Sequence, residues 1–435
     1  MAVTFPDFSA PGATNPTKGP SHARTLGSSG GVARTVGMVL VGVLSLGVAG
    51  AATAVTQLTG NIDTAQMAVL GPDRPKQVLP KDPNAGTPLN IVVMGSDSRD
   101  GDNGDLAGGG EMGARSDTTL VMHISGDRSR VEMISVPRDS TVDVPSCTTG
   151  DGTTTAPLYG TKFNAAFSQG VQAGGKVSDG ALCTVKAIEQ LTGVFINGFI
   201  VVDFAGFSSM VDAVGGVEVC VEQEIYSEKA NHLALSPGIH TLKGVKALDY
   251  ARARTGDGLG DGSDLGRIGR QQEVMASLAR KVLSQEVLTN PSKTLGFLGA
   301  VTDSLTMNQE LASIDGLAGL AYSMRNVRPD TITFMTVPNE YDPNNRANVV
   351  WTDEATTLWD DVKNDRPVVD APEGTTPSSS PSGSAGDGDT KNDDTKNDGT
   401  TDAETTTPDP SPSSTVIKQA GEEAFTSADT TKVCG

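Results

Sequence analysis

The chain contains one apolar run long enough to cross a lipid bilayer, and this run constrains its architecture more than any other feature. The run Val36 to Val55, VGMVLVGVLSLGVAGAATAV, carries no charge, and a spanning helix needs roughly 20 such residues. Lys18, Arg24 and Arg34 precede it, whereas Asp63 is the first charged residue after it. Because cytoplasmic flanks carry positive charge, we predict a single-pass cell-membrane protein with a cytoplasmic N-terminus and an extracytoplasmic remainder. A cleaved signal peptide ending in AGAATA is the alternative.

Composition divides the rest of the chain. The formal net charge of -20 argues against a nucleic-acid partner, because such proteins present an excess of Lys and Arg to phosphates. The stretch beyond Asp365 is rich in Thr, Ser, Pro, Asp and Gly and lacks the apolar residues that folding requires. We predict a disordered cytoplasmic tail (1–34), a transmembrane helix (35–57), a stalk (58–87), a catalytic domain (88–364), a disordered linker (365–415) and a C-terminal tail (416–435).

The catalytic domain alternates strand and helix patterns. The segments NIVVMGSDSR (90–99), TTLVMHIS (118–125) and RVEMISVPRD (130–139) are apolar runs of strand length that end in polar residues, as buried strands do. Helical patterns at 181–193, 206–216 and 267–285 alternate with further strands at 199–204, 217–223 and 331–338. This order predicts an α/β domain of three layers, with its ligand where the polar strand ends gather.

Two aspartates stand at such strand ends. Asp97 lies in GSDSR and Asp117 in RSDTT, and each has an ordinary explanation as a turn or cap residue. Together they offer carboxylate oxygens of the kind that Mg²⁺ shares with substrate phosphates. We therefore predict a Mg²⁺ site, with Mn²⁺ as the alternative metal, at Asp97 and Asp117, with Arg99 and Arg115 beside it.

Arginines concentrate in two further segments. Arg138 ends a strand in VPRD, and we predict a functional role for it at the same sheet edge as the aspartates. A surface pair with Asp139 is the alternative. Arg252 and Arg254 share a face if their segment is extended. In DLGRIGRQQ, the side chains of Arg267, Arg270 and Gln271 line one helix stripe. So many guanidinium groups in an acidic chain predict an anion, and their paired geometry suits a pyrophosphate.

The series GSDSR, RSDTT, ISVPRD, KFNAAF, LKGVKALDYARAR and D-x-x-R-x-x-RQ resembles the motif series of the LytR-CpsA-Psr family, over about 89–362. The resemblance implies a three-layer α/β/α domain with a central mixed sheet. It implies a Mg²⁺-dependent phosphotransferase that moves a glycopolymer from a polyprenyl pyrophosphate carrier to a peptidoglycan acceptor. It also implies pyrophosphate contacts from Arg115, Arg138, Arg252, Arg254, Arg267 and Arg270, with Asp264 and Gln271 alongside.

Several alternatives remain open at this stage. The same residues would serve a pyrophosphatase that uses water, or a lipid-glycan binding or regulatory protein without turnover. Lys162 and Asn164 of KFNAAF match the family signature but equally suit a strand or helix start. The proton acceptor is Asp97 or Asp264 in this interpretation, with Arg99, Arg115 and Arg138 completing the catalytic set.

Four cysteines follow the apolar run, so all four lie outside the membrane in this topology, where disulfides persist. Cys147 and Cys183 both fall between the PRD and LTG motifs, and we predict that they pair, with Cys147 in a loop and Cys183 at a helix start. Elimination leaves Cys220 with Cys434. Cys220 lies in the strand pattern VEVCVEQ, and a buried free thiol is the alternative there.

Overall fold

A computed structural model describes residues 63–79, 86–97, 115–260, 262–284, 305–313, 319–320, 324, 327–369, 418 and 420–429. The chain divides into the units Met1–Ala54 and Val55–Gly435, and all described residues belong to the second. The predicted membrane helix, Arg99 and Cys434 lie outside the described residues. Within the described part, no helix is long and apolar enough to span a bilayer.

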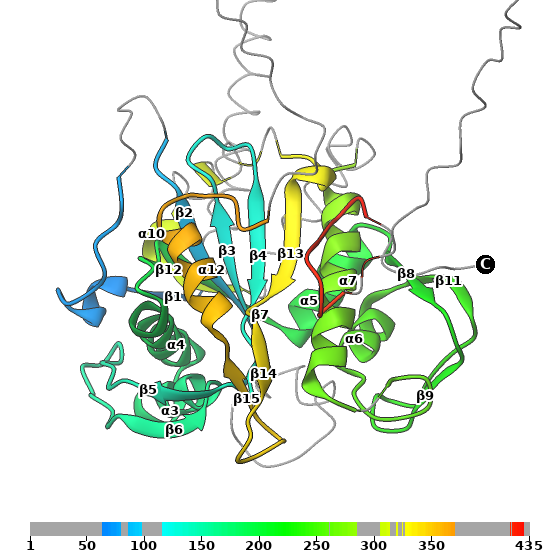
Figure 1. Cartoon of the computed structure of the whole chain (residues 1–435), viewed down its shortest axis with the longest axis horizontal. Coiled ribbons are helices and arrows are strands. Elements are labelled where there is room, and N and C mark those ends of the chain that lie inside the picture. The colour runs from blue at the N-terminus through cyan, green and yellow to red at the C-terminus, as the bar shows by residue number, and fades with distance from the viewer. Residues whose placement is uncertain are drawn as a thin grey trace, which may run out of the picture. The chain divides into compact units, whose positions relative to one another are not determined.

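The domain is built on one mixed sheet of eight strands (Figure 1). At its centre, β3 pairs antiparallel with both β2 and β4. On either side of these three strands, β2 pairs in parallel with β7, and β4 pairs in parallel with β13. In spatial order the strands are β1 (Asp63–Ala65), β12 (Leu305–Asn308), β7 (Gly198–Asp203), β2 (Leu89–Ser96), β3 (Ser116–Ile124), β4 (Val131–Ser135), β13 (Ile332–Thr336) and β16 (Phe425–Thr426).

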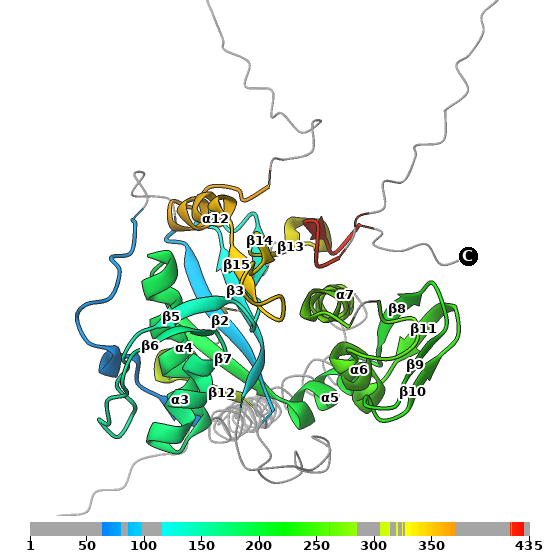
Figure 2. The same cartoon turned by 60° about the horizontal axis from the view of Figure 1, so that its bottom comes forward.

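Alternating side chains give this sheet two apolar faces. Val121 and Ile134 are fully buried in a cluster that includes residues of α4 (Val177–Thr192). Their strand neighbours Leu120 and Met133 join another cluster, which includes residues of α7 (Asp264–Val282). Figure 2 shows α4 and α7 on opposite sides of the sheet. The described domain therefore has the expected three layers, helix, sheet and helix.

Smaller elements surround the sheet. The strand expected at 217–223 forms as β8 (Val217–Val221), but it pairs with β11 (Gly238–Leu242) outside the main sheet. The remaining elements are η1 (Met67–Leu70), β5 (Thr141–Val144), β6 (Leu158–Lys162), α3 (Ala165–Gly174), α5 (Phe204–Ala213), β9 (Ile225–Ser227), β10 (Leu233–Leu235), α6 (Gly244–Arg252), α10 (Gln309–Ala312), η2 (Pro329–Thr331), β14 (Asn339–Tyr341), β15 (Val349–Trp351) and α12 (Asp353–Lys363).

The segment expected as a stalk is partly folded into the domain. The edge strand β1 pairs in parallel with β12, and Met67 and Leu70 are buried in the same core cluster as α4. Arg74 then forms an ion pair with the buried Glu189 of α4 at 2.6 Å. The domain consequently begins at or before Asp63, because this part of 58–87 carries apolar residues that complete the core.

The predicted disulfide between Cys147 and Cys183 is present, with a Cα–Cα distance of 5.3 Å. Cys183 lies within α4 and not at a helix start, because α4 begins at Val177. Cys220 is also disulfide-bonded. The prediction that pairs it with Cys434 involves a residue outside the described part of the chain.

The C-terminal segment 420–429 docks on the domain. β16 adds to the sheet as an antiparallel edge strand beside β13, and the rings of Phe425 and Phe334 stack at 5.5 Å. On the adjacent α7, the Gln272 Oε1 atom accepts a hydrogen bond from the Gly421 amide at 2.9 Å. A side chain at Gly269 would meet the Ala420 carbonyl oxygen at 2.3 Å, so this close approach requires glycine at 269.

Candidate active site

The two predicted metal-binding aspartates lie at the same edge of the sheet. Ser96 of β2 faces Ser116 of β3, and the register then slips, which leaves Asp117 as an extra residue in a β-bulge. Bulges of this kind re-aim a side chain, commonly beside an active site. Asp97 follows β2 directly; its amide donates to the Arg115 carbonyl at 3.0 Å, and its side chain accepts from the Arg115 amide. Both carboxylates are therefore positioned by the same pair of strands.

Arg138 lies three residues beyond the end of β4 and joins this acidic edge to α7. Its Nη1 atom donates to Asp117 Oδ1, and its Nε atom lies 3.3 Å from Asp264 Oδ1 and 3.7 Å from Asp139 Oδ2. Burial disfavours the charged guanidinium, but the three carboxylates outweigh burial and raise the pKa of Arg138. The surface pair with Asp139 is thus only part of a larger network, which supports the functional interpretation of VPRD.

The first turn of α7 supplies the other half of the site. Ser263 caps this helix by accepting from the Gly266 amide, and Asp264 is its first residue. Arg267 Nη2 lies 2.6 Å from Asp264 Oδ1 and donates to the Asp117 carbonyl oxygen at 3.0 Å. Burial raises the pKa of Asp264, opposed by Arg267 and Arg138, and burial lowers the pKa of Arg267, opposed by Asp264.

Several polar atoms of this network are buried without a hydrogen-bond partner in the described structure. They are both carboxylate oxygens of Asp264, the Nε atom of Arg138 and the Nε atom of Arg267. Unmade hydrogen bonds at buried groups cost free energy unless a ligand or water completes them. The two guanidinium Nε–H donors suit the oxygens of an anion such as a phosphate.

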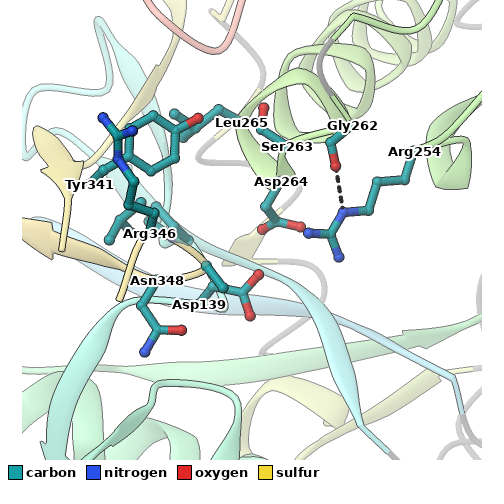
Figure 3. Close-up of a pocket in the computed structure, with 12 residues that line it drawn as sticks. Asp139, Arg254, Gly262, Ser263, Asp264, Leu265, Tyr341, Arg346 and Asn348 are labelled. Carbon is teal, nitrogen blue, oxygen red and sulfur yellow. Dashed lines mark hydrogen bonds between the residues drawn. The ribbon is translucent and has the colours of Figure 1, made fainter. Parts of the chain in front are cut away.

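The structure separates Arg252 from Arg254, and the expected extended segment is wrong. The helix α6 continues to Arg252, whose guanidinium lies 4.3 Å from the centre of the Phe204 ring. Arg254 comes after the helix, donates from Nε to the Gly262 carbonyl at 2.9 Å and lines a pocket next to Asp264. Figure 3 shows the Arg254 side chain pointing toward Asp264.

The helix stripe of Arg267, Arg270 and Gln271 is also divided. Arg270 is buried, and its Nε atom donates to the Ala253 carbonyl at 3.1 Å, which ties the end of α6 to α7. Burial lowers the pKa of Arg270, opposed by Tyr250 and Glu273. Gln271 is half-buried and lines neither pocket described below. The predicted pyrophosphate contacts from Arg270 and Gln271 are accordingly not supported in this structure.

Two pockets meet at this site. The first, the hairpin pocket, encloses about 420 Å³ between the start of α7 and the β14–β15 hairpin, and its lining includes Asp139, Arg254, Asp264, Tyr341, Arg346 and Asn348 (Figure 3). The second, the β6–α3 pocket, encloses about 590 Å³, and its lining includes Arg115, Arg138, Asp139, Lys162, Asn164 and Gln172. Asp139 lines both pockets and forms the wall between them.

Sequence reasoning missed part of this arrangement. The Lys162 Nζ atom lies 2.6 Å from Asp139 Oδ1, which gives KFNAAF a place at the site, and Asn164 precedes α3. The sequence alone leaves Lys162 and Asn164 open between a family signature and a strand or helix start. Tyr341 and Arg346 of the β14–β15 hairpin had no signal beyond a turn-like composition, because their position depends on contacts distant in sequence.

The mixed sheet and the cluster of arginines and aspartates at its edge form a candidate site for a phosphate-bearing anion. The LytR_cpsA_psr family model matches residues 54–364, and the chain belongs to this family.

Several known proteins are similar to part of this chain. The Probable cell wall biosynthesis protein LcpB of Corynebacterium glutamicum is 34% identical over 279 residues, which cover 62% of this chain and 59% of that protein. The Polyisoprenyl-teichoic acid–peptidoglycan teichoic acid transferase TagU of Oceanobacillus iheyensis is 32% identical over 251 residues, covering 57% of this chain and 68% of that protein. The solved LytR-Csp2A-Psr enzyme from Actinomyces oris has a TM-score of 0.49 and 20% identity, covering 70% of this chain and 95% of that structure.

Proposed function

We propose that the protein is a phosphotransferase that moves a glycopolymer from a polyprenyl pyrophosphate carrier to peptidoglycan. The observation that carries this proposal is the convergence of Arg138, Arg254 and Arg267 on the carboxylates of Asp117 and Asp264. The similarity to TagU of Oceanobacillus iheyensis, a polyisoprenyl-teichoic acid–peptidoglycan teichoic acid transferase, supports the same substrate classes.

The arginines would bind the pyrophosphate. The Nε–H donors of Arg138 and Arg267 are buried and make no hydrogen bond to a described residue, although Arg138 Nε lies within ion-pair distance of Asp264, at 3.3 Å. A guanidinium pairs well with phosphate oxygens. Arg254 contributes from the adjacent hairpin pocket. Because these groups are fixed before the substrate arrives, they would stabilise the charge that develops on the phosphate oxygens during transfer.

Asp97 and Asp117, which lie at the same edge of the sheet, would hold a Mg²⁺ ion together with the substrate. In the described part of the chain, no group of three or more His, Cys, Asp or Glu side chains could hold a metal, so the remaining ligands would be water and phosphate oxygens, as is usual for Mg²⁺. Asp117 Oδ2 approaches Arg267 Nη1 only to 4.0 Å, which leaves this oxygen suitable as a ligand. Mg²⁺, or Mn²⁺ in its place, would neutralise phosphate charge.

In the proposed reaction a peptidoglycan hydroxyl attacks the phosphorus that bears the glycan. A new bond forms between that oxygen and phosphorus, and the bond to the prenyl phosphate breaks with its electron pair leaving on the prenyl phosphate. The hydroxyl proton passes to a carboxylate. Asp264 suits this role because burial raises its pKa, which makes it a better proton acceptor than an exposed aspartate; Asp97 is the alternative.

We further propose that the run 36–55 anchors the protein in the cell membrane with the catalytic domain outside. This placement would bring the site to the lipid carrier and to the wall.

Reconstitution tests the proposal. Purified full-length protein is incubated with a prenyl pyrophosphate glycan and peptidoglycan, with and without Mg²⁺, and the products are identified by mass spectrometry. We expect Mg²⁺-dependent attachment of the glycan to peptidoglycan, and loss of that activity in Asp97→Ala. Glycan phosphate released only to water would support the alternative function, a prenyl pyrophosphatase. Binding without any turnover would support a lipid-glycan binding or regulatory protein instead.

A further inference from the structure

The β6–α3 pocket has a charged end, lined by Arg115, Arg138, Asp139 and Lys162, and a neutral wall along α3. Ser168, Gln169 and Gln172 lie on one stripe of α3 and line the β6–α3 pocket, with Asn164 at the start of that helix. These side chains are neutral and carry both donors and acceptors. Neutral amides and hydroxyls match the hydroxyl and N-acetyl groups of an amino-sugar glycan better than they match a phosphate, which favours guanidinium groups.

The Oε1 atom of Gln169 in this wall can accept a hydrogen bond that no described residue donates. The Gln169 side chain donates from Nε2 to the Ala156 carbonyl, and its Oε1 atom is buried with no hydrogen-bond partner in the described structure. A buried acceptor of this kind usually has a partner. A sugar hydroxyl or N-acetyl N–H entering the pocket would supply that donor.

The inner end of the β6–α3 pocket reaches the reaction centre. Lys162 holds Asp139 at 2.6 Å, and Arg138 and Arg115 complete this end of the pocket. Arg138 is the same guanidinium that contacts Asp117 and Asp264. A hydroxyl that enters along α3 would therefore arrive beside the arginines proposed to bind the phosphate.

The hairpin pocket offers two arginines to an anionic polymer, although Asp139 and Asp264 also line it. It contains Arg254, and Arg346 lies exposed at the hairpin without an ion pair to any described residue. A donor held at its pyrophosphate by Arg254 would continue past Arg346. A donor and an acceptor that react at one phosphorus must reach it from two separate binding sites. The two pockets provide such sites, because Asp139 lines both.

We propose that the β6–α3 pocket is the acceptor subsite and binds an amino-sugar glycan strand, while the hairpin pocket holds the donor glycan. This inference rests on the proposed function. It assigns Gln169, Gln172 and Ser168 to acceptor recognition and Arg346 to donor recognition.

The test compares Michaelis constants for the two substrates in full-length protein. The variant Gln169→Ala/Gln172→Ala should raise the KM for a soluble peptidoglycan fragment about 5- to 150-fold, the loss expected for two neutral hydrogen bonds. It should keep the wild-type KM for the donor. Arg346→Ala should raise the KM for the donor and keep that for the acceptor. Gln223→Ala, at an exposed glutamine after β8, is the matched control and should change neither constant.

Two outcomes would overturn the assignment: an unchanged acceptor KM in the double variant, or a parallel rise of both constants in a variant whose thermal unfolding matches the wild type. Direct binding separates this inference from the proposed function. If the wild-type protein transfers no glycan, titration calorimetry with the same peptidoglycan fragment still tests the pocket: binding that the double variant loses supports an acceptor subsite, and equal binding by both proteins refutes it.

Discussion

The different surroundings of Arg252 and Arg254 lead to opposite predictions for two neighbouring arginines. Arg254 lines the hairpin pocket beside Asp264, and its Nε atom donates a 2.9 Å hydrogen bond to the Gly262 carbonyl. Arg252 instead lies over the Phe204 ring at 4.3 Å. We expect Arg254→Ala to weaken binding of a prenyl pyrophosphate and Arg252→Ala to act mainly on stability.

The magnitudes follow from the interactions that are lost. A hydrogen bond to a charged group is worth about 1.5 to 3 kcal/mol, so Arg254→Ala should weaken binding roughly 10- to 150-fold at about 1.4 kcal/mol per factor of ten. Arg254→Lys should recover little, because an ammonium lacks the planar fork. Arg252→Ala removes a cation–π contact worth about 0.5 to 1 kcal/mol at an exposed site.

Titration calorimetry of full-length protein with a prenyl pyrophosphate measures the binding, and thermal unfolding measures the stability. Arg252→Ala serves as the matched control, since it removes the same group two residues away. The reasoning is wrong if Arg254→Ala binds as tightly as the wild type, or if both variants lose affinity equally.

Three further predictions address stability. Because burial raises the pKa of Asp264, the folded state keeps this proton at pH values where the unfolded chain has lost it. The unfolding free energy of Asp264→Asn relative to wild type should therefore increase as the pH rises from 3.8 through that raised pKa; a pH-independent difference in urea unfolding would contradict this. Replacing Cys147 and Cys183 by Ser removes a disulfide that joins residues 36 apart in the sequence. The free energy of unfolding measured in urea should fall by about 3 to 4 kcal/mol. A urea midpoint and slope equal to those of the wild type would refute this prediction. Phe425→Ala removes the ring stack on Phe334 and should raise the rate of amide hydrogen exchange across 425–427. An exchange rate equal to that of the wild type would contradict this prediction.

The strand ends of the site could be predicted from local patterns. Asp97, Asp117 and Arg138 follow or begin apolar runs of strand length, and the order of such runs predicts that their polar ends gather at one edge. The pairing of Cys147 with Cys183 could also be predicted, since both residues lie in the segment between the PRD and LTG motifs. These features could be predicted because they depend only on short segments of the sequence and on the apolar pattern of strands.

Other features depend on contacts that a local pattern does not contain. The pattern LKGVKALDYAR continues as a helix through Arg252, so the alternation expected for an extended segment does not apply there. Arg270 has the spacing of a site residue but is drawn to the Ala253 carbonyl by helix packing. The two-residue strand β16 and the burial of Phe425 arise from pairing with β13, which is far away in the sequence.

Isotope labelling tests the central claim, transfer of the glycan-bearing phosphate to a sugar hydroxyl, most directly. The full-length protein is incubated with a prenyl pyrophosphate glycan, peptidoglycan and Mg²⁺ in H₂¹⁸O, and the products are analysed by mass spectrometry. Transfer predicts a phosphodiester on peptidoglycan and a prenyl phosphate that both lack ¹⁸O, because the attacking oxygen comes from the acceptor and the bridging oxygen leaves with the prenyl phosphate. Incorporation of ¹⁸O into the released glycan phosphate or prenyl phosphate, with peptidoglycan unmodified, would show that water is the acceptor and contradict the claim.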